Sequence, residues 1–423
     1  MYLSTSRAAD IAGDTPAPKG PLRAVPGTVF ALGLVSLVTD VSAEMVTAVL
    51  PLYLMAGLGM TPLAFGALDG LHQGATALLR IAGGRIADRT RRRKLVAGAG
   101  YALSAACKAA LLAATTPWSV AAVLAADRTG KGLRTAPRDA LISLSCPPRL
   151  QGRAFGVHRA LDTAGALLGP LAAFGVLWVA VDGYEAVFTV SCCIAVLGVV
   201  LLALFVREAP AGAPGAAPAA ARAPLPPLVT LLRLPGLRRL CLTAAVLGLF
   251  TVGDAFLYLL LQRRLDLPAG YFPLLPVGTA AVFLLAAVPV GRLADRLGRR
   301  RVFLGGHVLL LGGCLLLLAP VPAGAALVVA VLALLGLFYA ATDGVLMAAA
   351  GPLLPAELRT TGLAVLQTAQ ALARFGGSLL FGAAWTLWGP GTALGLASGG
   401  LLLSLAAVAV SGGMRGPRAG GAS

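Results

Sequence analysis

Long apolar runs recur along this chain and are separated by short polar turns. A helix needs about 20 mostly apolar residues to cross the hydrocarbon core of a bilayer. Of all residues, 58% are hydrophobic and only 12% are charged, a composition that cannot cover a water-exposed surface. The sequence therefore predicts an all-α membrane protein that crosses the bilayer several times.

Twelve runs reach the required length, six before and six after a segment rich in Ala, Pro and Gly. The predicted spans of the first half lie near residues 27–54, 62–84, 95–115, 117–140, 154–178 and 186–206. Those of the second half lie near residues 238–261, 272–290, 302–319, 324–348, 362–387 and 391–411. The intervening segment can neither span a bilayer nor form a core, so we expect a flexible linker. The predicted organisation is a tail (1–24), a six-helix bundle (25–206), the linker (207–237), a pseudo-symmetric second bundle (238–411) and a tail (412–423).

Lys and Arg gather in alternate turns, and this distribution predicts the orientation. Basic turns face the cytoplasm in multi-pass proteins, so both termini and the linker are predicted to be cytoplasmic in a cell inner (plasma) membrane. The formal net charge of +17 then faces anionic lipid headgroups. Aromatic residues interleaved with the basic ones are missing, which argues against nucleic-acid binding. Arg263 and Arg264 are exceptions, because they follow the seventh span on the outer side.

One basic turn occurs once in each half. The first copy runs from Gly84 to Lys94 and the second starts at Gly291, with Gly, Asp and Arg at the same spacing. This recurrence indicates that the chain is duplicated. An orientation signal alone would not require the recurring Gly and Asp, so we favour a gating latch that also orients the helices. The residues assigned to this latch are Gly84, Asp88, Arg89, Arg92, Gly291, Asp295 and Arg296.

Charged residues inside the predicted spans are the candidate site. A charge at the bilayer centre costs at least about 2.5 kcal/mol, so these side chains are expected to pair or to face a polar cavity. Asp40 and Glu44 lie four residues apart on one face of the first span, and the fourth span repeats charges at spacings of three and four. The alternative is a permanent ion-pair network that only holds helices together. The coupling and cavity candidates are Asp40, Glu44, Asp69, His72, Asp127, Arg128, Lys131, Arg134, Asp162, Asp254 and Arg374.

Two pairs have the spacing of a proton relay. Asp69 and His72 share a face of the second span, and His158 and Asp162 share a face of the fifth. A membrane histidine is more often a structural hydrogen-bonding residue, so Asp40 or Glu44 is the preferred proton carrier.

Three further features concern the course of individual helices. Asp254 is expected in the middle of the seventh span, and Arg374 in the middle of the eleventh, where it either pairs with an acid or binds an anionic group. Residues 135–139 are expected to break the fourth helix near the cytoplasmic surface. Gly165, Gly169 and Pro170 are expected to allow close approach and bending of the fifth helix.

These motifs resemble those of the major facilitator superfamily. The turn after Gly84 is similar to the family's loop motif, and Leu124, Arg128, Lys131 and Gly132 resemble its fourth-helix motif. Gly156, Gly165, Gly169 and Pro170 resemble a fifth-helix motif often seen in exporters, although Leu171-Ala172-Ala173 replaces its closing glycine pair. Two further motifs resemble those of a bacterial subgroup of this family, namely Asp-x-Ser-x-Glu-Met (40–45) and Asp-Arg-x-Gly-Lys-Gly-x-Arg (127–134). The resemblance implies two six-helix bundles, a cytoplasmic linker and a turn that stabilises one alternating-access state.

The expected function is secondary active transport by alternating access, with proton-coupled export of a small organic or amphipathic solute. Import of a small metabolite is the alternative, followed by a non-transporting receptor or a membrane enzyme. We do not expect an enzyme, because no HxxxH, Ser-His-Asp set or Cys cluster is found. ATP-driven transport by this chain is not expected either, because it has no GxxxxGK[ST] loop. The six cysteines lack metal-ligand spacing, so no metal or cofactor is expected. The expected partners are the lipid bilayer, the solute and H⁺, and the expected functional unit is a monomer.

Overall fold

The computed structural model describes residues 26–70, 92–146, 151–180, 183–206, 233–343, 345–350, 353 and 359–411. The regular structure of these residues is entirely helical, which confirms the all-α prediction. Nine of the described helical segments are long and apolar enough to cross a membrane. Both tails, most of the linker, the turn residues Gly84, Asp88 and Arg89, and His72 lie outside the described residues. The cytoplasmic location of the termini and the full set of twelve spans therefore stay predictions.

The first half is built around α1, which packs against α5 and α6, while α3 packs against α4 and α6. The helices are α1 (Gly27–Leu52, extended by a π-helical turn Tyr53–Gly57), residues 62–70, α3 (Arg93–Ala113), α4 (Pro117–Leu144), α5 (Gln151–Val179) and α6 (Tyr184–Phe205). Small residues set the α1–α5 distance: a Cβ added at Gly165 would lie 2.5 Å from the Leu37 carbonyl oxygen, and one at Gly169 would lie 2.7 Å from Glu44 Cβ. Helix α5 continues through Pro170 to Val179.

In the second half, α8 packs against α14, and α12 packs against α10 and α11. The helices are α8 (Pro235–Leu249), α9 (Asp254–Leu265), the short η3 (Ala269–Tyr271), α10 (Leu274–Leu297), α11 (Arg299–Leu318), α12 (Ala325–Thr342), α13 (Val345–Ala350) and α14 (Arg359–Ser411). Helix α14 consists of two arms, because Gly389 has a φ of 83° and Pro390 follows it. This break separates the two spans predicted there.

The prediction of one continuous seventh helix is wrong. Residues 250–253 interrupt it, so that Asp254 is the first residue of α9 and does not lie mid-helix. The Thr251 hydroxyl donates to the Leu247 carbonyl at 2.9 Å, and the same carbonyl accepts a hydrogen bond of 3.2 Å from the Phe250 N–H at the end of α8. A carboxylate in the first turn of α9 suits the positive end of the helix dipole.

The predicted break in the fourth helix is also wrong. Helix α4 continues through Pro137 to Leu144. The Thr135 hydroxyl donates to the Lys131 carbonyl at 2.7 Å, a side-chain bond of the kind that helps a membrane helix accommodate a proline.

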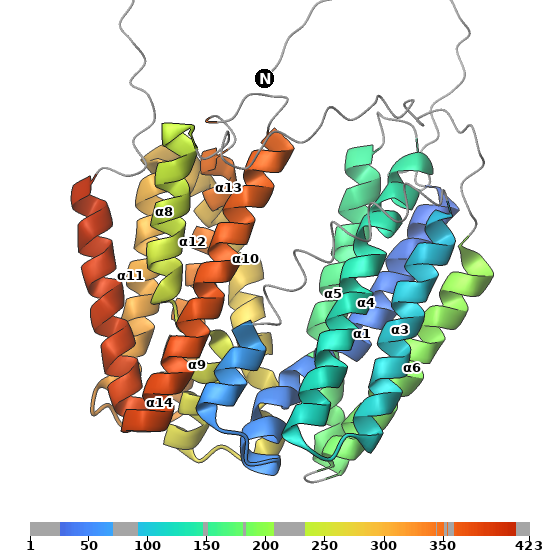
Figure 1. Cartoon of the computed structure of the whole chain (residues 1–423), viewed down its shortest axis with the longest axis horizontal. Coiled ribbons are helices and arrows are strands. Elements are labelled where there is room, and N and C mark those ends of the chain that lie inside the picture. Colours follow the sequence, from blue (N-terminus) through green and yellow to red (C-terminus); the bar gives the residue numbers. More distant parts are fainter. Residues whose placement is uncertain are drawn as a thin grey trace, which may run out of the picture.

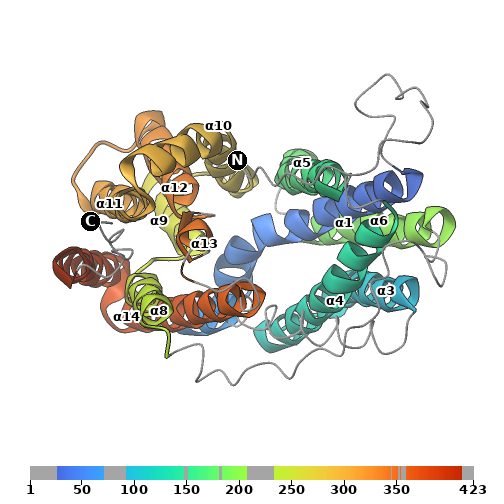
Figure 2. The ribbon, with the colours of Figure 1, turned by 90° about the horizontal axis from the view of Figure 1, so that it is seen from above.

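The two halves meet at one end and diverge toward the other (Figures 1 and 2). At the closed end, residues 62–70 of the first half lie against α14: Leu63 N–H donates to Thr386 Oγ1 at 3.0 Å. Glycine permits this approach, because a Cβ added at Gly66 would meet the Ser378 carbonyl oxygen. The basic residues that begin α3 and α11 lie at the diverging end. If these residues face the cytoplasm as predicted, this conformation is open toward the inside.

The two basic residues that violate the orientation pattern have local partners in the structure. The Arg264 guanidinium donates to four carbonyl oxygens at the end of α11, those of Leu316, Leu317, Ala319 and Val321, at 2.9, 2.6, 2.5 and 2.7 Å. Arg263 lies over the Trp385 ring, 5.2 Å from its centroid. These contacts give both residues a structural role that does not depend on orientation.

Candidate functional site

A cavity of about 430 Å³ lies between the two halves, next to the closed end. Its volume is in the range of small-molecule pockets. Three carboxylates line it: Glu44 from α1, Asp69 from residues 62–70, and Asp254 from α9. Apart from Thr47, its other lining residues are apolar or aromatic and include Phe65 and Tyr258. Both halves therefore contribute acidic groups to one cavity.

Hydroxyl groups, rather than cations, contact the two carboxylates nearest the closed end. Ser378 donates to Asp69 at 2.9 Å, and Tyr339 donates to Asp254 at 2.6 Å. Arg374 is close enough for its charge to act on Asp69. Among the described residues, however, it forms no ion pair within 4.0 Å. The pairing proposed for Arg374 is thus not formed in this conformation.

Helices α1, α3 and α4 form a layer of charges in the first half. Arg134 lies 3.6 Å from Asp40, and Lys131 lies 4.0 Å from both Asp40 and Glu44. The acidic face of α1 and the basic face of α4 thus meet. Asp127 faces α3 and pairs with Lys108 at 3.2 Å, both side chains being almost fully buried. The sequence reasoning missed Lys108, although a lysine in the apolar run near residues 95–115 was a visible signal.

A second charged cluster lies farther toward the diverging end and adjoins the first, because the carboxyl groups of Asp162 and Asp40 interact. Asp162 of α5 lies 3.7 Å from Arg138 and 3.3 Å from Arg159, and it accepts a hydrogen bond of 2.9 Å from Ser36. Arg138 also donates to Ser36 at 2.9 Å. His158 is buried, and neither ring nitrogen has a hydrogen-bond partner among the described residues, so it is not bonded to Asp162. Arg138 and Ser36 were not among the predicted site residues.

The described basic-turn residues lie at the diverging end. Gly291, Asp295 and Arg296 belong to α10, and Asp295 lies 3.9 Å from Arg299 at the start of α11. Arg296 occupies the last turn of α10, where a cation suits the helix dipole. Arg92 is the N-cap residue of α3. This pair lies within the second half and does not test the predicted gating latch, which stays a proposal.

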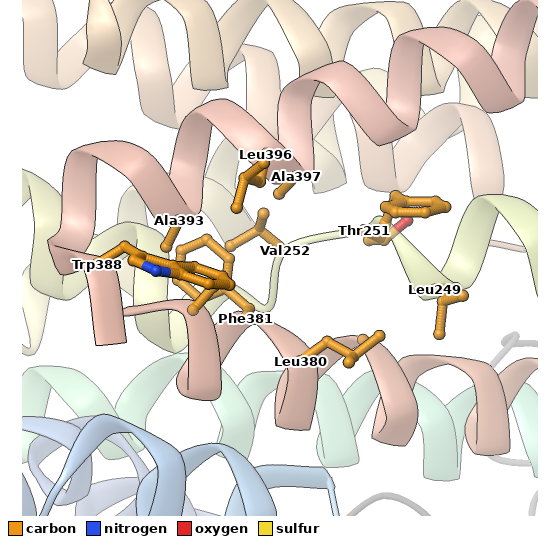
Figure 3. A pocket seen from close by; sticks show the side chains of 12 residues that line it. Leu249, Thr251, Val252, Leu380, Phe381, Trp388, Ala393, Leu396 and Ala397 are labelled. Atoms are coloured by element: carbon orange, nitrogen blue, oxygen red, sulfur yellow. The ribbon is translucent and has the colours of Figure 1, made fainter. Parts of the chain in front are cut away.

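A separate apolar pocket of about 190 Å³ lies at the break between α8 and α9 (Figure 3). Thr251 and Val252 from the break, and Leu380, Trp388 and Leu396 from the two arms of α14, line it. Leu380, Trp388 and Leu396 are more than half exposed on the protein surface. None of the described residues that line this pocket is charged, and the pocket is distinct from the acidic cavity.

The chain matches the family model described as Major Facilitator Superfamily over residues 32–378 and 255–419. The chain belongs to the Major Facilitator Superfamily. It is similar to an uncharacterized MFS-type transporter of Methanocaldococcus jannaschii, with 29% identity over 389 residues, 89% of this chain and 94% of the relative. An uncharacterized protein of Mycobacterium tuberculosis is 37% identical over 157 residues, which cover 37% of this chain and 38% of that protein.

Solved structures of low sequence identity share the Major Facilitator Superfamily fold. The nucleoside transporter NupG matches with a TM-score of 0.74 and 15% identity, over 90% of this chain and 98% of that one. A bacterial homologue of the lysosomal transporter Spinster, in an inward-facing unoccupied conformation, matches with a TM-score of 0.68 and 16% identity, over 90% and 93%. The chain is thus a multi-pass membrane transporter of the Major Facilitator Superfamily type.

Proposed function

We propose that this protein is a secondary active transporter that exports a small organic solute in exchange for protons. The supporting observation is the cavity between the two halves, which both halves line with carboxylates. It lies next to the closed end, and the two halves diverge on its other side. Rocking of one half against the other would close the diverging end and open the closed one, which is alternating access.

The ion layer of the first half supplies a means of proton coupling. Asp40 and Glu44 hold Lys131 and Arg134 of α4 through charge. A proton bound to either carboxylate removes the negative charge and releases its cation. The packing of α1 on α4 would then depend on protonation, and because Glu44 lines the cavity, so would solute binding.

Two features favour export over import. The diverging end is the end at which the basic turns predict the cytoplasm, so solute would load from inside in this conformation. Gly165, Gly169 and Pro170 also resemble a motif frequent in exporters, and both glycines lie where α5 contacts α1.

Purified protein in liposomes that contain a trapped pH-sensitive dye tests this proposal. A panel of organic solutes is added on either side of a preset pH gradient, and solute-dependent proton flux is recorded. We expect solute-dependent proton flux with a subset of the solutes. The flux should be largest when the solute is on the cytoplasmic side of the protein and the proton concentration is higher on the opposite side. Asp40→Asn and Glu44→Gln should abolish it, whereas Glu185→Gln, at an exposed acid at the start of α6, should retain it.

Three results would contradict the proposal. Solute flux that does not depend on the pH gradient would contradict proton coupling. Proton flux that stays at the wild-type level in both acid variants would remove Asp40 and Glu44 from the mechanism. Preference for solute on the opposite side would favour the import alternative.

A further inference from the structure

Among the residues that the structure describes, Arg128 is a buried cation without an ion-pair partner. Only 6% of its surface is exposed, and its Nε atom is buried without a hydrogen bond. Among the described residues, no carboxylate lies within 4.0 Å of its guanidinium. Its neighbours on α4 differ in this respect, because Asp127, Lys131 and Arg134 all form ion pairs.

The charges around Arg128 do not balance. The layer formed by α1, α3 and α4 contains three carboxylates, those of Asp40, Glu44 and Asp127. It contains four cations, of which Lys108, Lys131 and Arg134 are paired. Asp127, Glu44 and Asp40 act on Arg128 from a distance, but each of them already forms an ion pair with another cation. One positive charge is therefore left over.

An uncompensated buried charge is costly, so a residue of this kind persists where a function requires it. A guanidinium presents a planar fork of N–H donors that matches the two oxygens of a carboxylate or a phosphate. Lys131 lies three residues farther along, one helical turn from Arg128, with 32% of its side chain exposed. Arg128 is not among the described residues that line the cavity, but Lys131, its neighbour on α4, pairs with Glu44, which does.

We propose that Arg128 binds an anionic oxygen group, a carboxylate or a phosphate, of the transported solute. This inference rests on the proposed transport function for its biological meaning, but the binding itself does not require proton coupling. A bound anion would supply the missing negative charge of the layer. Solutes without an anionic group would leave Arg128 unpaired and would bind more weakly.

The full-length protein, purified in detergent, tests the proposal by thermal unfolding. The probes are sodium phosphate, sodium acetate and sodium benzoate, each compared with sodium chloride at equal ionic strength, with tetraethylammonium chloride as a cationic probe. We expect at least one oxyanion to raise the Tm of the wild type in a saturable way, and the cation to leave it unchanged. Arg128→Gln should abolish this rise, and Arg128→Lys, which keeps the charge but loses the fork, should weaken it.

A second readout separates ligand binding from a structural role. Because Arg128→Gln removes an unpaired buried charge, its Tm in chloride should equal or exceed that of the wild type. Arg239→Gln, at an exposed arginine of α8, is the matched control and should keep the wild-type response to oxyanions.

Three outcomes would overturn the proposal. In the first, no oxyanion stabilises the wild type more than chloride does. In the second, the Arg128→Gln variant keeps the full oxyanion response. In the third, Arg128→Gln lowers the Tm in chloride as much as Lys108→Met does. Failure of proton-coupled flux in liposomes together with an Arg128-dependent Tm rise would instead reject only the coupling mechanism.

Discussion

The carboxylate of Asp69 accepts a 2.9 Å hydrogen bond from Ser378, and this bond joins the first half of the chain to the second. Asp69 also lies next to Gly253, the residue before α9, since a Cβ added there would be 3.2 Å from Asp69 Oδ2. One acidic side chain thus touches both α14 and the break in the seventh helix. This contact has to break if the closed end is to open.

Loss of the Ser378 hydroxyl should shift the protein toward opening of the closed end. A hydrogen bond to a charged acceptor contributes about 1.5–3 kcal/mol, enough to change a two-state population by roughly tenfold or more. We therefore expect Ser378→Ala to increase labelling of a cysteine at Thr47, which lines the cavity, by an impermeant maleimide added at the closed end. The six native cysteines are first replaced. Ser404→Ala is the control, because Ser404 bonds within its own helix; equal labelling in all three proteins would contradict the expectation.

A covalent bridge across the closed end should stop transport. A disulfide between cysteines at positions 63 and 386 would connect the two halves, because the N–H of Leu63 lies 3.0 Å from Oγ1 of Thr386. Oxidation should abolish solute-dependent flux, and a reductant should restore it. A bridge between Ser42 and Ser191 positions is the matched control, because their hydroxyls are 2.9 Å apart inside the first half. If the Leu63–Thr386 bridge forms but flux continues, the closed end does not have to open during transport.

The Lys108–Asp127 pair should behave as a structural ion pair. Both side chains are at most 5% exposed, and removal of one partner of a buried pair costs about 3–5 kcal/mol because the other charge is left alone. Lys108→Met should therefore lower the Tm strongly, whereas Lys108→Met combined with Asp127→Leu should recover much of the loss. A double-mutant cycle measures this coupling. Additive losses would show that the two residues act independently.

Arg264 should stabilise the protein through the end of α11. The planar guanidinium of Arg264 binds four carbonyl oxygens, and a lysine ammonium cannot reach all of them. Arg264→Lys should therefore lower the free energy of unfolding by about 1–3 kcal/mol and lower the Tm. Arg263→Lys serves as the comparison, because a lysine retains part of the interaction with the Trp385 ring. Equal effects of the two substitutions would argue against this role of Arg264.

Apolar run length predicted most of the helices, because bilayer thickness imposes nearly the same length on every span. Helical periodicity also predicted which charges meet: Asp40 and Glu44 on one face of α1 contact Lys131 on α4. Both predictions depend on constraints that act within one helix or equally on all helices, namely helical spacing and bilayer thickness. Such constraints can be inferred from a single sequence.

Contacts between distant helices were less predictable. Run length did not reveal the break before Asp254, because residues 250–253 are apolar enough to continue a span. The partner of Asp69 was equally hidden, since Ser378 lies 309 residues farther along the chain. The unpaired state of Arg128 became visible only when each nearby carboxylate could be assigned to another cation.

The charge content of α4 has a consequence for how the protein is made. Each Asp, Lys or Arg at the centre of a span adds about 2.5–3.5 kcal/mol to the free energy of insertion, and Asp127, Arg128, Lys131 and Arg134 are all on this helix. Helix α4 is accordingly not among the nine described spans that are apolar enough to insert by composition. It has to enter the bilayer alongside Lys108 of α3 and Asp40 of α1, which neutralise its charges. During synthesis, the first half would thus be released into the lipid as a group of helices.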